Sequence, residues 1–361
     1  MTSLACRLAG RLPIVSAAVA HLGPAVLRCR GLAAPPGAAA HCLQQPRLHQ
    51  RRGAAAAAVG GGGGEAVPED SHLIQGILSG ILAPYWESTP TAEAAISALE
   101  ARFPEALIGI DHLAFRTFGL EGLGISSVAY LFTDFDYTRR DALTFPAKKL
   151  RACWYAPPDP ELPRVFISEI KVEELSSAAQ AVVRKYAGPP AAAALLGKYG
   201  LTSALLGVTP WCPPSLEDYE TLARESEYAA WVLVNGYALN HTTIAVHRLR
   251  GLEGGIERLN AFLQEQGFTF NEAGGLTKVS PDGLLLQSST VADRVSACFA
   301  GGETRLVPGA YIEFAERLVL PEFSHLKPDE VEERHRRDGF ETASADRIFE
   351  STTLAAKPDT V

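Results

Sequence analysis

The sequence predicts an α+β fold built from two copies of a strand–helix–three-strand (βαβββ) unit. The predicted elements run in the order strand, helix, three strands, helical insert, then strand, helix and three or four strands. The two units begin alike, with Ile-Asp-His-Leu-Ala-Phe at 110–115 and Leu-Asn-His-Thr-Thr-Ile at 239–244. They also end alike, with Val-Phe-Ile-Ser-Glu at 165–169 and Ala-Tyr-Ile-Glu-Phe at 310–314. Such self-similarity indicates an internal repeat.

Two helices are predicted ahead of the first repeat. Over 69–83 the apolar residues recur with the period of an amphipathic helix. Thr89 and Pro90 are expected to cap and open a second helix, which ends near Arg102.

The first repeat covers about 105–172 and the second about 236–318. Residues 125–134 suit either a helix or a strand, and we favour a helix because a glycine-bounded apolar run precedes them. The expected strands are rich in β-branched and aromatic residues. They lie at 109–119, 142–146, 150–155 and 164–172 in the first repeat, and at 239–246, 276–279, 284–287, 304–307 and 310–317 in the second, where a helix is expected at 255–266.

Helices are also predicted between and after the repeats. The insert, about 173–235, is expected to form several helices separated by proline-rich breaks. Within it, helices are expected at 172–186 and 216–232. The charged tail, 319–361, includes a possible short helix through Arg336. Near its end, Ile348 and Phe349 are expected to pack on the body.

The N-terminal segment, 1–64, differs in composition from the rest of the chain. It contains seven arginines, no lysine and no acidic residue, and it ends in alanines followed by a glycine run at 60–64. This composition is typical of an organellar transit peptide followed by a flexible joint, and the alternative is a disordered tail without an address. We favour the plastid, with the mitochondrion as the alternative. The apolar stretch 12–27 is too short and too interrupted by proline to span a membrane.

The remaining chain, 65–361, is expected to form a single catalytic domain and is acidic. The formal net charge of the whole protein is −8, although its first 64 residues contribute only positive charge. Nucleic acids and anionic membranes bind clustered positive charge, so neither is expected as a partner. Cys153, Cys212 and Cys298 are too widely spaced for a zinc or redox motif, and we expect them to pack as small apolar groups. The oligomeric state is left open.

The first strand of the first repeat carries both an imidazole and a guanidinium on one face. Alternation along the strand places Ile110, His112, Ala114 and Arg116 on one face, and Leu113, Phe115 and Thr117 on the other. The Cα atoms of His112 and Arg116 should be roughly 13 Å apart. This spacing suits a metal at one end and an anionic group at the other. The alternative is a half-buried strand whose His and Arg merely reach solvent.

Two further strands show the same division into a ligand-bearing face and an apolar face. In the second repeat His241 lies on the face opposite Ile244, and in the last strand Tyr311 and Glu313 lie opposite Phe314. Two histidines and one carboxylate from three separate strands, His112, His241 and Glu313, are the components of a facial triad. Such a site suits Fe(II), and Mn(II), Co(II) or Zn(II) remain open on residue type alone.

Three neighbouring residues have supporting roles in this hypothesis. Arg116 would bind the distal carboxylate of a substrate in a bidentate manner. Glu169 is taken to occupy the place in the first repeat that Glu313 holds in the second. It is expected to contact one of the metal ligands or to form a salt bridge, for which Arg116 is a candidate partner. The alternative is that Glu169 is itself a fourth metal ligand. Tyr311, beside the triad, is expected in the second shell.

Four motifs carry a resemblance to a known family: GIDHLAFRTF at 109–118, FPAKKLRACWYAPP at 145–158, LPRVFISE at 162–169 and LNHTT at 239–243. In these motifs the chain resembles the 2-oxoadipate dioxygenase/decarboxylase family, also called hydroxyglutarate synthases, from about Ile74 to the C-terminus. That family is similar to the vicinal-oxygen-chelate superfamily. The resemblance implies two βαβββ units that form a curved sheet or half-barrel around one metal, with the helices outside.

The resemblance also implies a reaction and a set of site residues. Fe(II) would be held by His112, His241 and Glu313, Arg116 would bind the far carboxylate of the substrate, and Ala343 and Ser344 would contact it from the C-terminal segment. The reaction would convert 2-oxoadipate and O2 to 2-hydroxyglutarate and CO2 in lysine breakdown. Bacterial relatives have extra sequence between the last ligand strand and the tail, which leaves open how this chain closes the substrate end.

Two other functional classes remain open at this point. One is a different metal-dependent reaction on the same scaffold, such as extradiol cleavage or isomerisation, because a fold does not determine its chemistry. The other is a non-enzymatic plastid binding or scaffold protein that keeps a vestigial cup.

Overall fold

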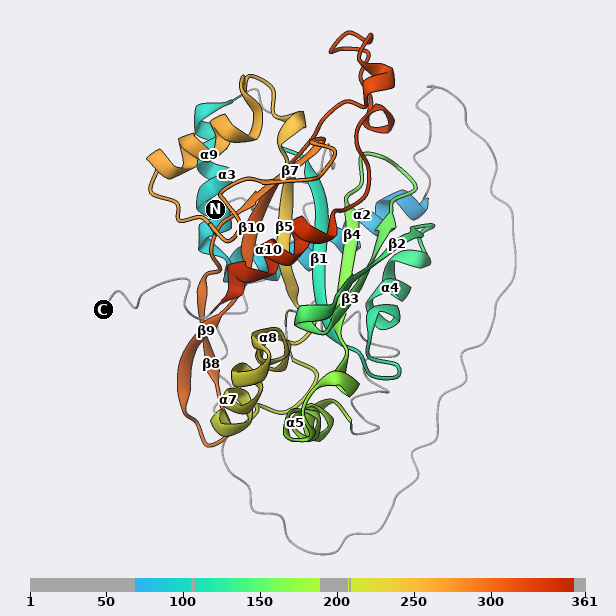
Figure 1. Cartoon of the computed structure of the whole chain (residues 1–361). Coiled ribbons are helices and arrows are strands. Elements are labelled where there is room, and N and C mark those ends of the chain that lie inside the picture. Colours follow the sequence, from blue (N-terminus) through green and yellow to red (C-terminus); the bar gives the residue numbers. More distant parts are fainter. Residues whose placement is uncertain (1–68, 105–107, 189–206, 208, 354–361) are drawn as a thin grey trace, which may run out of the picture. The chain divides into compact units, whose positions relative to one another are not determined.

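The two predicted repeats supply the two halves of one sheet. The first half consists of β1 (Ile110–Phe118), β2 (Thr138–Phe145), β3 (Leu150–Ala156) and β4 (Arg164–Ile170). The second half consists of β5 (Leu239–Ala245), β6 (Lys278–Val279), β7 (Leu285–Ser289) and β10 (Tyr311–Arg317). Figure 1 shows these strands in the computed structural model, which describes residues 69–104, 108–188, 207 and 209–353.

The strand order reveals an approximate twofold relation between the halves. The sheet runs β2-β3-β4-β1-β5-β10-β7-β6, with β1 antiparallel to β5 at its centre. β4 is parallel to β1 just as β10 is parallel to β5, and β3 and β7 follow as antiparallel neighbours. The predicted α+β class with two βαβββ repeats in a curved half-barrel is therefore confirmed.

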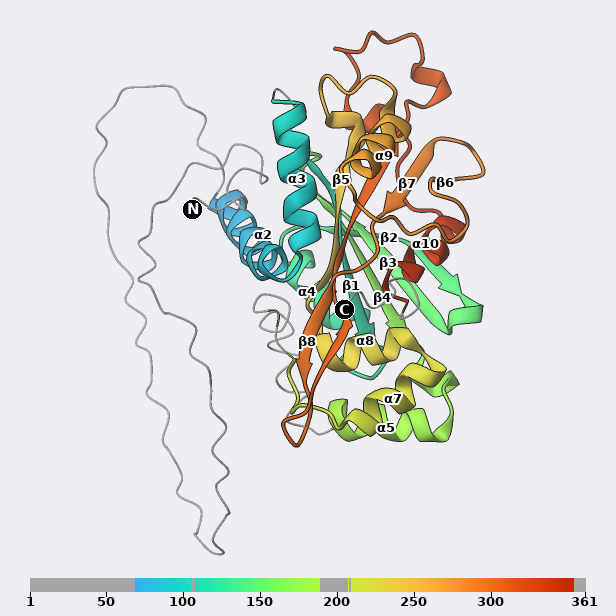
Figure 2. The same ribbon diagram turned by 90° about the vertical axis from the view of Figure 1, so that its left-hand side faces the viewer.

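Helices cover the sheet, as the apolar face of its strands requires. α2 (Glu69–Ser88) contacts β5, and α3 (Pro90–Arg102) contacts β10. α4 (Ile125–Thr133) packs on β3 and β4, and α9 (Gly255–Glu265) packs on β7 and β10. The helix predicted at 125–134 is confirmed by α4. Figure 2 shows α2 and α3 on one side of the sheet. Thr89 is the N-cap residue of α3, but its hydroxyl makes no capping hydrogen bond, contrary to expectation.

The insert between the repeats is helical, with two differences from the prediction. The helix expected at 172–186 begins only at Ser177, because Val172–Glu174 forms a separate 3-10 turn and Leu175 is extended. It contains α5 (Ser177–Ala187), α7 (Leu216–Glu225) and α8 (Glu227–Asn235). The single helix expected at 216–232 is wrong because Ser226 leaves the helical conformation, with φ −150° and ψ 102°. Its hydroxyl accepts a hydrogen bond from the backbone N–H of Ala229 and so caps α8. The break lets α8 turn and pack against β1. The predicted break at Pro189 lies outside the described residues.

The hairpin between β7 and β10 was only half predicted. β8 (Arg294–Cys298) was not expected, and it pairs with β9 (Thr304–Pro308) in a separate two-stranded sheet. β8 is short, and its apolar face consists of only Val295 and Ala297, which is too brief an alternation to recognise as a strand. Cys153 is buried as expected, whereas Cys212 and Cys298 are exposed, which corrects the expectation for those two residues.

The C-terminal segment crosses the open face of the sheet. α10 (Thr342–Ile348), which was not predicted, is followed by a 3-10 turn, η6 (Phe349–Thr352). Figure 1 shows α10 (red) in front of the central strands, and Figure 2 shows it on the side opposite α2 and α3. Ile348 and Phe349 are buried, as predicted. The short helix expected through Arg336 is a single 3-10 turn, η5 (Glu333–His335).

The proposed transit peptide and linker, 1–64, lie outside the described residues. None of the described helices combines the length and the apolar character that a bilayer-spanning segment needs.

Candidate functional site

Three side chains predicted as metal ligands meet on the concave side of the sheet. His112 on β1, His241 on β5 and Glu313 on β10 each offer a ligand atom, and these atoms all lie within 4.8 Å of one another. The Glu313 Oε2 atom lies 3.1 Å from the Nε2 atom of His241 and 3.8 Å from that of His112. All three residues are at least nine-tenths buried. Because β1, β5 and β10 are neighbours in the sheet, residues distant in sequence converge here.

The second nitrogen of each imidazole is held by the residue that precedes it. The Nδ1 atom of His112 lies 2.7 Å from Asp111 Oδ1, and that of His241 lies 3.0 Å from Asn240 Oδ1. Donation from Nδ1 to these oxygens places the lone pair of each ring on Nε2, the atom that would bind a cation. In the structure the Nε2 atom of His112 lies 2.9 Å from the Thr243 Oγ1 atom, a hydroxyl that a bound cation would displace. The two halves of the fold thus orient their imidazoles in the same way, one with a carboxylate and one with an amide.

The carboxylate behind His112 is itself fixed by charge. Asp111 accepts hydrogen bonds of 2.6 and 3.0 Å from Arg317. Arg164 lies 3.5 Å from it. Burial alone would raise the pKa of Asp111, but the Arg317 charge, the His112 hydrogen bond and the Arg164 charge together hold that pKa well below its ordinary value. Asp111 is therefore ionised, and it acts on His112 as an acceptor of constant charge.

The protonation states of His241 and Glu313 are those that a cation site needs. Burial lowers the pKa of His241 to about 4, despite the opposing effect of the nearby Glu313. Burial would raise the pKa of Glu313, but the imidazoles of His112 and His241 and the amide of Gln287 lower it overall. Gln287 donates to Glu313 Oε1 at 2.7 Å, which leaves Oε2 directed at the histidines. At neutral pH the set therefore offers a neutral His241 imidazole and an anionic carboxylate.

Aromatic rings close the space around the imidazoles. Tyr311 stacks on His241, with ring centroids 4.6 Å apart. Phe340, from the segment before α10, packs edge-on against His112 at 4.8 Å. These contacts keep both rings in place and exclude water from the triad. The location of Tyr311 next to His241 agrees with its expected position beside the triad.

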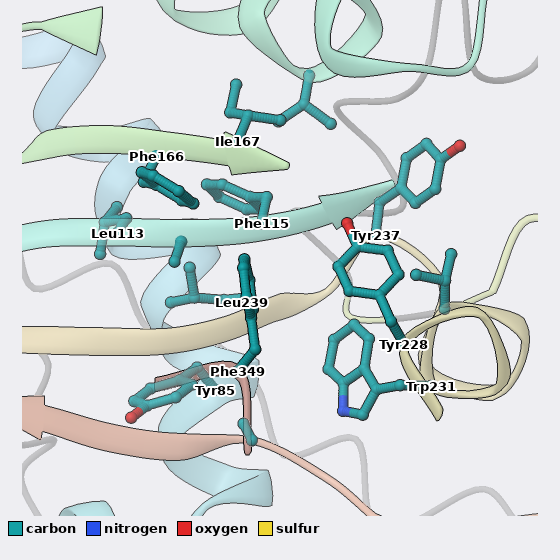
Figure 3. Close-up of a cluster of buried hydrophobic side chains, with 14 of the residues drawn as sticks. Tyr85, Leu113, Phe115, Phe166, Ile167, Tyr228, Trp231, Tyr237, Leu239 and Phe349 are labelled. Carbon is teal, nitrogen blue, oxygen red and sulfur yellow. The ribbon is translucent and has the colours of Figure 1, made fainter. Parts of the chain in front are cut away.

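Arg116 lies further along β1 and is also buried, with 2 % of its surface exposed. Its guanidinium carbon lies 5.1 Å from the ring centre of Tyr228, 5.3 Å from that of Trp231 and 5.5 Å from that of Phe349. Figure 3 shows Tyr228 and Trp231 projecting from α8 beside the end of β1, with Phe349 close by. The cation is thus surrounded mainly by aromatic carbon, which is an unusual place for a charge.

The hydrogen bonds of Arg116 in the described part of the chain go to neutral oxygens, the Tyr311 hydroxyl among them, and Glu227 contributes a negative charge nearby. Nη1 donates to Thr352 Oγ1 at 2.9 Å, and Nη2 lies 3.5 Å from the Phe349 carbonyl. Its Nε atom is buried without a hydrogen-bond partner among the described residues. Burial lowers the pKa of Arg116 from its ordinary high value. Because arginine nevertheless stays charged, an anion placed beside it would be strongly favoured.

The salt bridge expected for Glu169 is present, but its partner is Arg151 rather than Arg116, and Glu169 is neither a ligand nor a neighbour of the triad. Its side chain accepts a hydrogen bond from the Ile125 backbone N–H at 2.7 Å and forms an ion pair with Arg151. It therefore faces α4 rather than the triad, and Arg116 is not its partner. The pairing of β4 with β1 explains the error, since Glu169 is level with Thr117 on the helix-facing side.

Strand register identifies the true counterpart of Glu313. In the second half Glu313 is level with Thr243, two residues beyond His241. In the first half the residue level with Ala114, two beyond His112, is Phe166. Because Phe166 occupies this position, the first half has no carboxylate equivalent to Glu313. The first half therefore contributes one histidine to the triad, and the second half contributes a histidine and the carboxylate.

The expected substrate contacts at Ala343 and Ser344 lie at the beginning of α10. Ser344 is buried. In this segment the groups that accept hydrogen bonds from Arg116 are instead the Phe349 carbonyl and the Thr352 hydroxyl, both in η6. A direct role for Ala343 and Ser344 stays a prediction.

Several residues of the site were not recognised in the sequence. Asp111 and Asn240 could have been found, because each repeat places an Asp or Asn directly before its histidine. Gln287 and Thr352 carry no such signal. Their roles depend on contacts with Glu313, 26 residues away, and with Arg116, 236 residues away.

Comparison with known proteins assigns the chain to a family. A family model described as 2-oxoadipate dioxygenase/decarboxylase matches residues 85–194 and 198–327. The chain is 50% identical over 291 residues to the chloroplastic 2-oxoadipate dioxygenase/decarboxylase of Arabidopsis thaliana, covering 77% of each protein. It is 47% identical over 300 residues to the chloroplastic/amyloplastic 2-oxoadipate dioxygenase/decarboxylase of Oryza sativa subsp. japonica, covering 80% of this chain and 81% of that protein.

A solved structure agrees with this assignment. The hydroxyglutarate synthase of Oryza sativa in complex with 2-oxoadipate is 46% identical, with a TM-score of 0.77, and the match covers 84% of this chain and 99% of that one. The chain therefore belongs to the 2-oxoadipate dioxygenase/decarboxylase family.

Proposed function

We propose that this protein is an Fe(II)-dependent enzyme that converts 2-oxoadipate and O2 to 2-hydroxyglutarate and CO2. The observation that carries the proposal is the convergence of His112, His241 and Glu313 from three strands, with Arg116 buried further along the same face. The relatives named for this reaction, and the rice structure that contains 2-oxoadipate, support it. By the same analogy we place the reaction in lysine breakdown.

His112, His241 and Glu313 are the residues that would hold the metal. Their chemistry fits a ferrous ion: His241 is neutral, Glu313 is anionic, and the other nitrogen of each imidazole is already occupied. With three protein ligands, a bound ion would keep coordination positions for substrate and dioxygen. A bound ferrous ion would supply the dioxygen chemistry, and Mn(II), Co(II) or Zn(II) could occupy the same ligands in a purified sample.

Arg116 would select the substrate by its second carboxylate. A buried guanidinium with an unpartnered Nε and aromatic neighbours is poorly compensated until an anion reaches it. A dicarboxylate whose 2-oxo end lies at the triad could extend its far carboxylate towards Arg116. A monocarboxylate of equal length would leave the cation unpaired, which penalises the wrong substrate.

The protein's own contribution is to orient the reactants and exclude water. Asp111 and Gln287 fix the directions of a triad imidazole and the triad carboxylate. Phe340 and Tyr311 cover the two imidazoles with carbon. Such a closed environment protects reactive oxygen species from side reactions with solvent.

The proposal is tested by supplying Fe(II), O2 and 2-oxoadipate to the full-length protein. We expect one O2 consumed and one CO2 and one 2-hydroxyglutarate formed for each 2-oxoadipate, with both atoms of ¹⁸O2 recovered in the organic product. Oxygen electrode readings and mass spectrometry provide these quantities.

Absence of oxygen uptake and of 2-hydroxyglutarate with stoichiometric iron bound would refute the reaction. Turnover of catechols or isomerisable substrates instead would favour another reaction on this scaffold. Failure to bind any metal would favour a binding or scaffold protein.

We also propose that the protein acts in the plastid. The acid-free, arginine-containing segment 1–64 and the chloroplastic and amyloplastic names of the two relatives support this location. Residues 1–64 fused to a fluorescent protein should carry it into plastids, and its arrival in mitochondria would contradict the proposal.

A further inference from the structure

The position of Arg116 depends on the C-terminal turn η6. Two residues of this turn, Thr352 and Phe349, accept hydrogen bonds from the guanidinium, which also contacts Tyr311 on β10. The Phe349 ring lies 5.5 Å from the guanidinium carbon. These contacts join β1 to a segment more than 230 residues away in sequence. A single 3-10 turn has too few internal hydrogen bonds to hold its own position. Other parts of the molecule must therefore fix it.

Ser351 is the residue by which η6 is attached to the second half of the sheet. Its hydroxyl receives a hydrogen bond from the Asn271 side chain at 3.0 Å and lies 2.9 Å from Ser289 Oγ. Its carbonyl accepts from the Ala292 backbone N–H at 2.8 Å. Asn271 also donates to the Arg347 carbonyl at the end of α10, at 2.9 Å. One buried amide thus holds both α10 and η6.

Asn271 is itself firmly placed. Its backbone N–H donates to the Ser289 carbonyl at 2.8 Å, and its Oδ1 accepts from the Ala273 backbone N–H at 3.0 Å. Its carbonyl accepts from the ammonium group of Lys278, which is buried. The amide therefore projects from a fixed loop between α9 and β6 that lies beside the end of β7. Both hydrogen bonds that it donates go to the C-terminal segment.

The segment has other attachments as well: the Phe349 ring packs on Phe145 and Tyr228, and the Tyr311 hydroxyl lies 3.5 Å from the Ile348 carbonyl. Its ion pairs are weaker. Lys148 lies 2.6 Å from Glu350 and 3.3 Å from Asp346, and all three side chains are about a quarter to a third exposed. Ion pairs at such partly exposed positions contribute little and are screened by salt. The buried hydrogen bonds of Asn271 are not screened in this way, and leaving their acceptors unpaired is costly.

We propose that Asn271 is a positioning residue for substrate selection. By holding Ser351 and the end of α10, it fixes Thr352 and Phe349, and through them the direction in which the Arg116 guanidinium points. The inference rests on the proposed function, in which Arg116 recognises a distal carboxylate. Neither the triad nor Arg116 touches Asn271 in the contacts described above, so its effect should appear in selectivity rather than in metal binding.

The test uses Asn271→Asp, with Glu272→Gln as the matched control in the same loop. Aspartate keeps the size of the side chain and the acceptor for Ala273, but it has no N–H to donate to Arg347 or Ser351. We expect KM for 2-oxoadipate to rise about tenfold, as for the loss of one to two buried hydrogen bonds, with kcat and iron content unchanged. The preference for 2-oxoadipate over 2-oxohexanoate, which lacks the distal carboxylate, should fall by a similar factor.

A second measurement does not depend on activity. Hydrogen exchange of the backbone amides in 342–353 should be faster in Asn271→Asp than in the wild type and the Glu272→Gln control. Asn271→Ala should behave like Asn271→Asp, and Ser351→Ala combined with either should add less than the sum of the single effects.

The outcomes separate the two hypotheses. A wild-type protein that does not act on 2-oxoadipate refutes the proposed function, while the exchange experiment still decides whether Asn271 holds the turn. Unchanged exchange overturns the inference. So does faster exchange with an unchanged ratio of KM values for the two substrates, because Asn271 would then have only a structural role.

Discussion

Replacement of His241 or Glu313 by alanine is expected to release the bound metal and abolish turnover. Each residue supplies one of the three ligand atoms that lie within 4.8 Å of one another. With one removed, two protein ligands remain on a cation that needs five or six, and the remaining buried imidazole or carboxylate loses its partner. Iron content after addition of Fe(II) and desalting, measured by elemental analysis, is the direct readout.

Asp111→Asn provides a graded comparison for this prediction. The substitution gives the first half the amide that Asn240 already supplies in the second half. Because the amide lacks the charge, metal affinity should fall roughly 10–100-fold rather than disappear. The loss of the Arg317 ion pair would lower stability as well, so unfolding is measured in parallel. Stoichiometric iron retained in His241→Ala or Glu313→Ala would exclude that residue as a ligand.

Replacement of Arg116 by alanine is expected to lower kcat/KM for 2-oxoadipate by about 100-fold or more, mainly through KM. Hydrogen bonds to charged groups contribute about 1.5–3 kcal/mol each, and a bidentate pair contributes two of them. The triad is left intact, so iron content should not change. Initial rates over a range of 2-oxoadipate concentrations measure the effect.

Two controls give this prediction its specificity. Arg116→Lys keeps the positive charge but cannot form the planar bidentate pair, so it should recover only part of the lost affinity. The rate with 2-oxohexanoate should hardly fall in Arg116→Ala, because that substrate has no distal carboxylate to lose. An equal fall in kcat/KM for both substrates would show that Arg116 supports the shape of the site but does not bind the distal carboxylate.

The C-terminal segment connects these predictions to one another. Phe340 packs on His112 at the metal end, and Thr352 bonds to Arg116 at the other end. A stretch of little more than ten residues thus lines the site along its length. Arg317 supports its beginning, because it donates to the Gly339 carbonyl at 2.8 Å while also holding Asp111. Folding of this segment and completion of the site are therefore coupled.

The repeat, the strands that carry the site and the identity of the three converging residues could all be predicted from the amino-acid sequence alone. These features follow from a local rule, since alternation along a strand assigns each side chain to one of two faces. His112, His241 and Glu313 each lie opposite apolar neighbours, and the repeat places the two histidines in corresponding strands. The roles of Asp111 and Asn240 were available from the same pattern, because each lies next to its histidine.

The neighbours of these residues in space could be identified only from the folded structure. Glu169 was misplaced because sequence similarity between repeats does not fix the register of β4 against β1, which makes Phe166 the counterpart of Glu313. The break at Ser226 depends on α8 turning to pack on β1. Thr352 accepts a hydrogen bond from the Arg116 guanidinium, 236 residues away, and Asn271 donates one to Ser351, 80 residues away. Such contacts have no periodicity in the sequence, and they exist only once the two halves of the sheet and the C-terminal segment have packed together.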